Sequence, residues 1–200
     1  MSARRGGVAP EPFTGAVLTG GASRRMGADK AFVVVRGAPL CTYPQRALLE
    51  AGARRVLAVG GARVEELRGL GFETVADRHP GEGPLGAVVT ALEAATDSVV
   101  VVLACDLPAV DAVAVVALLR ALRRTGAEVA VPIAAGRRQL AAGAYRRVAL
   151  RKLSAAFESG IRSLHGALRS LEVTEVATAA GVFDDVDEPA QLRRYASVDP

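Results

Sequence analysis

Short apolar segments rich in β-branched residues alternate along the chain with segments whose apolar positions recur at helical spacing. The first pattern predicts strands and the second predicts helices. The predicted strands are 13–18, 55–59, 73–76, 98–104, 128–133 and 182–186, and the predicted helices are 40–51, 85–95, 111–124 and a terminal helix from about 189. In the predicted helix 40–51, Thr42 stands at the expected N-cap and Gly52 at the expected stop.

Strands that alternate with helices across short loops are typical of βαβ units, which have right-handed crossovers and form a mostly parallel sheet. The segment 98–104 is continuously apolar, as in a strand that is buried on both faces. We therefore expect an α/β fold, a Rossmann-like three-layer α/β/α sandwich, in a single domain of residues 13–196. Residues 1–12 are interpreted as a flexible leader and 197–200 as a tail. Region 136–171, where the alternation is weaker, is expected to leave the main sheet.

Half of the 200 residues are apolar, which suffices for a domain with a sizeable core and excludes a disordered protein. Two cysteines and two histidines are too few for a disulfide framework, a structural zinc site or a histidine-rich metal site. The sequence has no signal-peptide pattern, and its longest apolar run, 99–105, is far too short to cross a membrane. We expect a soluble, cytoplasmic protein without a membrane partner.

Basic residues outnumber acidic ones by 25 to 21, for a net charge of +4. The arginines come in scattered pairs without aromatic side chains between them to stack on bases, so we do not expect nucleic-acid binding. The positive charge fits a small anionic substrate instead. Among the basic residues only Lys30 and Lys152 are lysines, so a lysine at a candidate site indicates a need for a compact point charge.

The segment after the first predicted strand carries two glycines and three cations: Gly20, Gly21, Arg24, Arg25 and Lys30. Glycines directly after a strand let backbone N–H groups approach an anion closely, and the three cations lie within reach of a triphosphate. The segment matches neither the P-loop nor the GxGxxG pattern. The alternative for the arginine pair is a solvated surface loop.

Asp106 follows the most apolar of the predicted strands. A carboxylate in such a place is costly unless it is hydrogen-bonded or binds a cation. Because Mg²⁺ is held by one or two carboxylates together with phosphate oxygens, Asp106 is predicted to be a metal ligand. The alternative role, capping of the next helix, suits Asp111 better. The neighbouring Cys105 is interpreted as a small buried apolar residue and not as a nucleophile.

A cluster of four acids lies just before Pro189: Asp184, Asp185, Asp187 and Glu188. Proline and acids are ordinary at the start of a helix, and this accounts for Asp187 and Glu188. Strand alternation places Asp185 and Asp187 on the same side of the chain. Either of these two is therefore a candidate to complete the metal shell of Asp106.

Four segments, in order along the chain, resemble the motifs of the molybdenum cofactor guanylyltransferase family of nucleotidyltransferases. Residues 18–30 are similar to the family's LxGGxSxRMGxDK signature, and residues 80–87 to its PGxxGPLAG loop. Residues 105–108 are similar to its CDxP motif, and residues 185–189 to its closing NVNTP segment. The first motif is the most specific, and together they cover nearly the whole chain.

This resemblance implies the nucleotide-diphospho-sugar transferase type of the Rossmann-like fold. It also implies transfer of GMP from GTP to the phosphate of molybdopterin, with Mg²⁺ as cofactor and release of pyrophosphate. The partners it implies are GTP, molybdopterin carrying molybdenum, and proteins that mature molybdoenzymes. Because a phosphate monoester is already an anion near neutral pH, the reaction needs no general base, and the lack of a candidate catalytic histidine is no objection.

The same resemblance assigns roles at the matching nucleotide-binding positions. Leu18, Thr19, Gly20 and Gly21 would bind the nucleotide, the first three through backbone groups. Lys30 would bind the phosphates, and Asp106 would bind Mg²⁺ and the nucleotide. Lys30, Arg25 and Asp106 form the expected catalytic set, which aligns the reactants and neutralises the charge that develops during transfer.

Base and acceptor recognition follow from other segments of the resemblance. Asp77 stands where the family has an aspartate that contacts the nucleotide, and its carboxylate would accept the N1–H and N2–H₂ donors of guanine. Gln139 and Arg162 resemble segments on the acceptor side, where a cation would hold the pterin phosphate. The alternative for Arg162 is a solvated arginine on the surface.

The sequence departs from the family pattern at several positions. Thr19 replaces the usual alanine, Gly86 and Ala87 reverse the usual order, and acids stand at 185 and 187 where asparagine is common. A base-contacting asparagine is also missing, and Gly60 or Gly61 lies near its position. Guanine specificity is therefore implied less firmly than nucleotidyl transfer.

Three alternatives follow: a cytidylyltransferase for the same cofactor, a nucleotidyltransferase for another phosphorylated metabolite, and a non-catalytic relative that binds GTP or the cofactor. The double glycine at 20–21 favours guanine by resemblance. The presence of both Lys30 and Asp106 argues against the non-catalytic alternative, since a pure binder has less need of a lysine and a metal at the phosphates.

Overall fold

The structure is a computed structural model, and it describes residues 11–20, 29–134, 136–140 and 142–186, together with Gln191 and Tyr195. Gly21, Arg25 and Asp187 therefore lie outside the described residues, as do the tail 197–200 and most of the predicted leader and terminal helix. Glu11, at the end of the predicted leader, is described, and its carboxylate accepts a hydrogen bond of 2.7 Å from the Ser98 hydroxyl.

The described residues form one eight-stranded sheet, in which β8 pairs with β7 and the other strands lie in the order β10-β7-β9-β6-β1-β4-β5. Its strands are β1 (Phe13–Leu18), β4 (Arg55–Val59), β5 (Glu73–Val75), β6 (Val99–Ala104), β7 (Val129–Ala134), β8 (Arg137–Arg138), β9 (Ala142–Arg146) and β10 (Val173–Ala177). β1 is parallel to both of its neighbours, β4 and β6. β5 is parallel to β4 and β10 to β7, whereas β9 runs antiparallel to β6 and β7. The mostly parallel sheet is thus confirmed. A separate small hairpin pairs β2 (Val34–Val35) with β3 (Ala38–Pro39).

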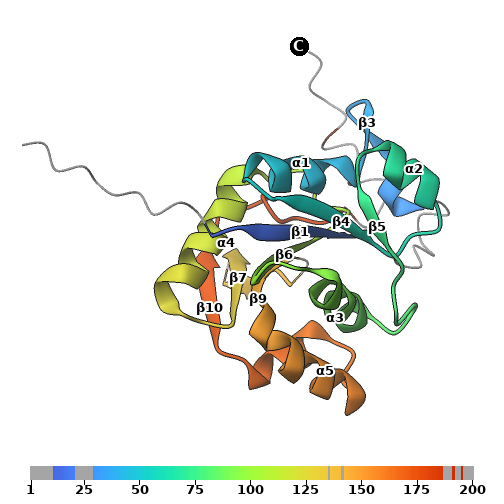
Figure 1. Ribbon diagram of the computed structural model, residues 1–200. Helices are drawn as coiled ribbons and strands as arrows, with labels where there is room; N and C mark the ends of the chain where they lie inside the picture. Colours follow the sequence, from blue (N-terminus) through green and yellow to red (C-terminus); the bar gives the residue numbers. More distant parts are fainter. Residues whose placement is uncertain are drawn as a thin grey trace, which may run out of the picture.

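Helices cover both faces of the sheet (Figure 1). They are α1 (Thr42–Glu50), α2 (Val64–Gly69), α3 (Pro84–Ala94), α4 (Ala112–Thr125), α5 (Leu150–Glu158) and α6 (Leu164–Ala167), with short 3₁₀ segments η1 (Lys30–Phe32), η2 (Arg147–Ala149) and η3 (Leu168–Ser170). One hydrophobic core contains buried leucines of α1, α2 and α4: Leu48, Leu67 and Leu118. The core on the other face contains those of α3, α5 and α6: Leu92, Leu153 and Leu164. The expected three-layer α/β/α sandwich is confirmed.

The prediction for region 136–171 is partly wrong. β9 does not leave the sheet but lies between β6 and β7, antiparallel to both. Its sequence, Ala142 to Arg146, is made mostly of small residues, which have no strong preference for strands, yet Ala144 and Tyr145 are buried there. Only the part of the region that follows β9, with α5 and α6, lies outside the sheet, and it packs on one face of it.

Two predicted details of helix starts have different outcomes. Asp111 caps α4, because its carboxylate accepts a hydrogen bond of 2.8 Å from Ala114 N. Thr42 is not the N-cap of α1: it is the first helical residue, and its hydroxyl donates to Pro39 O at 2.7 Å. At the other end of α1, Gly52 has a positive φ of 95°, as expected for a helix stop.

The predicted strand 182–186 is wrong, since this segment forms turns and makes no ladder with the sheet. The last strand of the described chain is β10, which the sequence did not predict. Phe183 and Val186 are nevertheless buried, so the apolar residues of this segment anchor it to the protein without strand pairing. Asp185 therefore does not lie on a strand, and strand alternation cannot place it on the same side as Asp187.

Candidate active site

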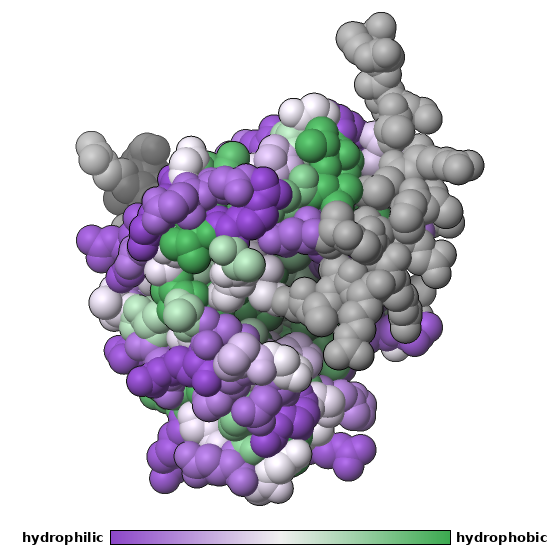
Figure 2. Space-filling model, turned by 90° about the vertical axis from the view of Figure 1, so that its right-hand side faces the viewer, coloured by the Kyte–Doolittle hydropathy of each residue, from purple (hydrophilic) through white to green (hydrophobic). Residues whose placement is uncertain are grey.

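The carboxyl ends of β1, β4, β5 and β6 lie at one edge of the sheet, because these strands are parallel and adjacent. Leu18 at the end of β1 pairs with Val59 of β4 and with Ala104 of β6. The residues that follow each strand are thus brought together, and ligands of open α/β sheets bind at such an edge. Figure 2 looks at the side of the molecule that carries α2 and β5, where hydrophilic residues surround smaller apolar areas.

Lys30 and Asp106 meet at this edge although 76 positions separate them in the sequence. The ammonium nitrogen of Lys30 forms a hydrogen-bonded ion pair with Asp106 Oδ2, and the two side chains are only 13% and 14% exposed. Both residues were predicted from the sequence to lie at one phosphate site, and the structure brings them into contact. A mostly buried pair of this kind is more strongly coupled than a pair in open solvent.

Lys30 is held in place by the short helix η1 around it. The Asp29 carboxylate caps this helix by accepting from Ala31 N at 3.2 Å. Ala31 is buried, and its carbonyl oxygen accepts from Cys41 N at 3.0 Å, which ties η1 to the start of α1. The lysine therefore projects from an anchored turn.

Asp106 is fixed by hydrogen bonds on both sides of its turn. Cys105 N donates to Leu18 O at 3.2 Å, which joins the end of β6 to the end of β1. Val186 N donates to the backbone oxygen of Asp106 at 3.1 Å, which brings the segment carrying Asp185 to the site.

The carboxylate of Asp106 has one oxygen that the described protein does not satisfy. Its Oδ1 is buried and has no hydrogen-bond partner among the described residues, whereas Oδ2 is bonded to Lys30. A buried carboxylate oxygen without a donor is energetically costly, and a hard cation such as Mg²⁺ is a ligand that would satisfy it. Asp106 therefore fits the predicted role of metal ligand.

Asp106 is not part of an all-protein metal cage in the described chain, where no group of three histidine, cysteine or acidic residues is arranged to hold a metal. This is compatible with Mg²⁺, which usually keeps several waters and binds substrate phosphates. Asp185 is exposed, next to Val186, and the assignment of a second ligand to Asp185 or Asp187 stays a prediction.

The backbone after β1 is tightly packed against the end of β4. Thr19 N and Gly20 N both donate to Val59 O, at 2.9 and 3.1 Å, and the Thr19 hydroxyl donates to Gly60 O at 3.0 Å. Gly60 has a φ of 77°, and a Cβ added to it would lie 2.9 Å from Gly20 Cα. Glycine is thus required at Gly60, one of the two positions near which the family's asparagine would stand. The Thr19 and Gly20 N–H groups already have partners, so any backbone contact of these two residues with a nucleotide would use their carbonyl oxygens.

Asp77 lies beside this close contact, and its Cβ is 3.5 Å from the point where a Cβ on Gly60 would lie. Its Oδ1 accepts from His79 N at 2.9 Å and from the Thr90 hydroxyl at 3.3 Å. Oδ2 has no hydrogen-bond partner in the described part of the chain and remains able to accept from a ligand. Asp77 is therefore placed near the glycines, as the base-recognition hypothesis requires.

Thr90, which was not predicted from the sequence, organises the loop around Asp77. Thr90 is 1% exposed on α3, its hydroxyl accepts from Arg78 N at 3.2 Å, and Gly86 O is a second acceptor for its proton at 3.0 Å. A single threonine in an apolar helix gives no sequence signal for this role.

Arg162 holds the loop 80–84 against the helical cover. Its guanidinium pairs with Glu82 at 2.9 Å, donates to Phe157 O at 2.6 Å and lies 4.1 Å from the centre of the Phe157 ring. His79 packs on the same ring, with 4.3 Å between the ring centres. Gly86 packs closely against His79. A Cβ added to Gly86 would lie 2.7 Å from His79 Cβ, and this explains the glycine at that position. Arg162 is exposed at the surface, as the alternative expects, but these contacts hold its side chain in place. Its predicted contact with an acceptor stays a prediction.

Gln139 lies in the turn between β8 and β9. Its backbone N donates to Pro132 O at 2.8 Å, and its side-chain amide donates to Arg137 O at 3.4 Å. The described contacts of Gln139 are thus with its own hairpin, and its predicted role in acceptor binding stays a prediction.

The two cysteines are buried close to the site. Burial raises the pKa of the Cys41 thiol to about 11, and burial together with the Asp106 carboxylate raises the pKa of Cys105 still further. Both thiols are thus protonated near neutral pH, which agrees with the interpretation of Cys105 as an apolar residue.

No helix in the described ranges is both long and apolar enough to cross a membrane.

Comparisons with known proteins identify relatives of this chain. Residues 15–174 match the family described as the MobA-like NTP transferase domain. The molybdenum cofactor guanylyltransferase of Xanthomonas euvesicatoria pv. vesicatoria (strain 85-10) is 31% identical over 190 residues, which cover 94% of this chain and 97% of that protein. The molybdenum cofactor guanylyltransferase of Cupriavidus pinatubonensis is 33% identical over 144 residues, 66% of this chain and 69% of that protein.

Solved structures share the fold. The molybdopterin-guanine dinucleotide biosynthesis protein A of Archaeoglobus fulgidus superposes with a TM-score of 0.75 at 24% identity, covering 92% of this chain and 96% of that one. The 2-C-methyl-D-erythritol 4-phosphate cytidylyltransferase of Thermus thermophilus superposes with a TM-score of 0.71 at 19% identity, covering 91% and 96%. The family match spans most of the sequence and the Xanthomonas relative extends over nearly the full chain, so this chain belongs to the MobA-like NTP transferase family.

Proposed function

We propose that this protein transfers GMP from GTP to the phosphate of molybdopterin and releases pyrophosphate. The observation that carries the proposal is the Lys30–Asp106 pair, with its unsatisfied buried carboxylate oxygen, at the ligand-binding edge of the sheet. The names of the relatives, molybdenum cofactor guanylyltransferases, support the choice of these two substrates.

The reaction needs alignment and charge neutralisation and no proton transfer by the protein. A phosphate oxygen of molybdopterin attacks the α-phosphorus of GTP, the bond between the α-phosphorus and its bridging oxygen breaks, and the electron pair leaves with pyrophosphate. The nucleophile is an anion already, so no general base is required.

Lys30 binds the triphosphate in this proposal. An ammonium has three N–H donors and can bond a phosphate oxygen while it keeps its bond to Asp106. Arg25, outside the described residues, is the proposed second cation at the phosphates. Asp106, whose Oδ1 is unsatisfied, would hold Mg²⁺, and the bound ion would neutralise charge on the phosphates and on the departing pyrophosphate.

Asp77 supplies the proposed specificity for guanine. Guanine offers the N1–H and N2–H₂ donors on one edge, and a carboxylate accepts both, whereas adenine and cytosine do not present that pair of donors. The proposal is supported by the open Oδ2 of Asp77 and by its place beside Gly20 and Gly60.

The experiment is a pyrophosphate-release assay with GTP, CTP and ATP in turn, each with Mg²⁺ and molybdopterin as acceptor. Release with GTP alone supports the proposed reaction, and release with CTP alone would replace it by cytidylyl transfer. Absence of release with any nucleotide, in a sample that binds GTP, would favour another acceptor or a non-catalytic relative. Omission of molybdopterin is the control, because hydrolysis without an acceptor would also release phosphate products.

A further inference from the structure

β10 is an edge strand whose outer side is unpaired in the described part of the chain. It bonds to β7 only, through alternate residues: Thr178 N donates to Ile133 O and Glu172 O accepts from Val129 N, both at 3.1 Å. Successive residues of a strand direct their backbone groups to opposite sides. The N–H and C=O groups of Val173, Glu175 and Ala177 therefore point outward, where they form a template for another strand.

A groove of about 710 Å³ runs between this edge strand and α4. Its lining consists of residues of α4 and of the second half of β10: Ala117, Arg120, Ala121, Arg123, Arg124 and Glu175 to Ala177. The α4 wall combines two small alanines with three arginines, and the backbone of an extended chain would fit beside the alanines.

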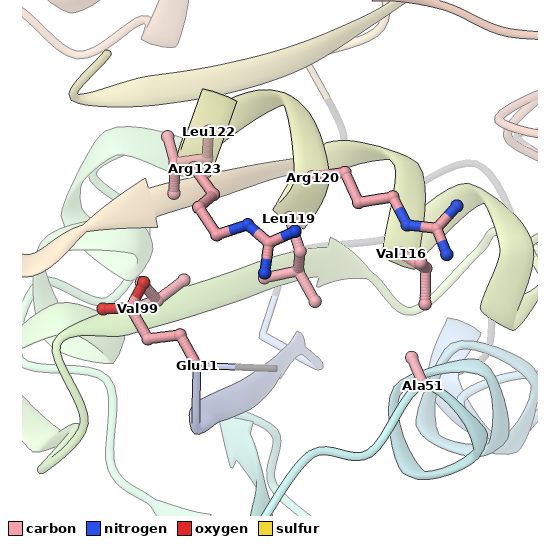
Figure 3. A pocket seen from close by; sticks show the side chains of 8 residues that line it. All are labelled: Glu11, Ala51, Val99, Val116, Leu119, Arg120, Leu122 and Arg123. Atoms are coloured by element: carbon pink, nitrogen blue, oxygen red, sulfur yellow. The ribbon is translucent and has the colours of Figure 1, made fainter. Parts of the chain in front are cut away.

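Three arginines form a ridge along α4: Arg120, Arg123 and Arg124. Their spacing of three and four residues places them on one face of the helix. Arg120 and Arg123 also border a second hollow, of about 270 Å³, on the α1 side of α4, where Figure 3 shows them beside Leu119 and Val116. The ridge thus stands between two hollows on the surface.

The ridge forms no ion pair within the described residues, although Glu11 lines the second hollow together with Arg120 and Arg123. All three arginines are exposed, and no ion pair joins any of them to a described acid, whereas the one acid that lines the groove, Glu175, is paired with Arg138 at 2.7 Å. Positive charge in the last turn of a helix interacts favourably with the helix dipole, which accounts for Arg123 and Arg124. That effect does not account for Arg120, which lies a turn earlier.

We propose that β10 and the arginine ridge together bind an extended, acidic segment of a partner protein. The segment adds as a further strand to β10, and its carboxylates on the α4 side contact the ridge. Backbone hydrogen bonds supply affinity in strand addition, and side-chain contacts supply selectivity. This surface is built from elements other than those that carry Lys30, Asp106 and Asp77, so the proposal does not depend on the identity of the substrates.

A second copy of this chain is a less suitable occupant. Symmetric pairing of two β10 strands would bring the two arginine ridges to the same junction, where like charges repel. An acidic partner instead neutralises the ridge.

The test uses the full chain and a fluorescein-labelled peptide of alternating valine and glutamate, roughly ten residues long. Fluorescence anisotropy measures binding, and a peptide of alternating valine and lysine is the charge control. We expect saturable binding of the glutamate peptide only, with an affinity that falls as salt rises. Absence of saturable binding, or equal binding of both peptides, would overturn the proposal.

Protein variants separate strand addition from simple charge attraction. Ala177→Pro removes one outward N–H without removing a bond to β7, and we expect about tenfold weaker binding, while Ala177→Val keeps the N–H and binds as the parent does. Arg120→Ala with Arg124→Ala should weaken binding by at least about tenfold, and Arg151→Ala, an exposed arginine of α5, should not. Binding that responds to the arginine variants but not to Ala177→Pro would contradict strand addition.

Modified peptides give the same test without changing the protein. One peptide is N-methylated at its valines and another at its glutamates, so each lacks the donors of one side of the strand. We expect one of them to bind as the parent peptide does and the other to lose binding, since only one side faces β10. Equal effects of the two patterns would overturn the proposal. A mass by light scattering that is dimeric, and becomes monomeric in Ala177→Pro, would show that a second copy occupies the edge instead.

Discussion

Val186 donates its backbone N–H to the backbone oxygen of Asp106, at 3.1 Å, although 80 positions separate the two residues in the sequence. Val186 is fully buried, and Phe183 packs into the same core as β1 and β6. The turn that carries the candidate metal ligand is therefore fixed from one side by Leu18 and from the other by a segment close to the end of the described chain.

This contact makes Val186 a positioning residue for Asp106. Val186→Pro removes the N–H, and Val186→Ala keeps it while losing a similar part of the side-chain packing. We expect Val186→Pro to lower kcat by about tenfold relative to Val186→Ala, with similar unfolding temperatures for the two variants. Pyrophosphate release and thermal unfolding measure this. Equal kcat values for the two variants would contradict the positioning role.

The pairing of Lys30 with Asp106 predicts how substitution of either residue changes activity and stability. Lys30→Ala and Asp106→Ala should each lower pyrophosphate release by a factor of about 10² or more, since each removes charge stabilisation at the phosphates. Lys30→Ala also leaves the mostly buried Asp106 carboxylate without its lysine partner. We therefore expect the double variant to unfold at a higher temperature than Lys30→Ala, while it stays inactive.

Lys152 offers a matched control for this experiment. It is the other lysine of the chain and also pairs with an acid, Glu128, at 2.8 Å, but its side chain is 39% exposed. Lys152→Ala should leave the rate of pyrophosphate release unchanged and alter stability only slightly. A rate for Lys30→Ala close to that for Lys152→Ala would remove Lys30 from the mechanism.

The contacts of Thr90 predict that its substitution affects nucleotide binding and not the rate of the chemical step. Thr90→Val removes the hydroxyl that bonds Arg78 N and Asp77 Oδ1 but keeps the shape of the side chain. We expect KM for GTP to rise about tenfold with kcat little changed, because the hydroxyl orients Asp77 and does not approach the reacting phosphorus in the proposed reaction.

Thr90→Ser is the rescue variant, since it restores the hydroxyl, and it should keep KM within a few-fold of the parent value. The relative preference for GTP over CTP should fall in Thr90→Val and recover in Thr90→Ser. A loss of stability without any change in KM or preference would leave Thr90 with a structural role only.

The sequence predicted the central strands well because their patterns are strong. β1, β4 and β6 are continuous runs of apolar and β-branched residues, and their observed bounds differ from the predicted ones by at most one residue. β9 was missed because alanine and glycine give no strand pattern, and its place depends on pairing with β6 and β7. The apolar positions of 182–186 predicted a strand. In the structure this segment is not a strand, and Phe183 and Val186 are buried without strand pairing.

The same difference applies to the candidate site. Lys30, Asp77 and Asp106 were found because their residue types carry chemistry in recognisable motifs, and the structure brings Lys30 and Asp106 into contact. Val186 and Thr90 were missed because one acts through its backbone N–H and the other through a hydroxyl buried in an apolar helix. The sequence does not distinguish these two groups from backbone N–H groups and hydroxyls that have no such role. Only the tertiary contacts reveal them.

The buried thiols predict how stability depends on alkaline pH. An exposed thiol, as in the unfolded chain, has a pKa near 9.0, and burial raises the pKa of Cys41 to about 11 and that of Cys105 further. Both thiols therefore stay neutral in the folded protein at a pH where the unfolded chain already releases their protons. Their contribution to stability is complete below about pH 9 and is lost as the pH rises above it, with a slope of at most ~1.4 kcal/mol per pH unit for each thiol.

Urea unfolding of the parent and of the Cys41→Ala, Cys105→Ala double variant, between about pH 7 and pH 10, measures this contribution. The double variant should be less stable at neutral pH, because it loses buried packing, but its disadvantage should shrink as the pH rises above about 9. Comparing the two proteins cancels the other alkaline groups, including Tyr145, whose pKa burial also raises. Parallel stability curves would show that the thiols titrate alike in the folded and unfolded chains, which their burial in the structure does not allow.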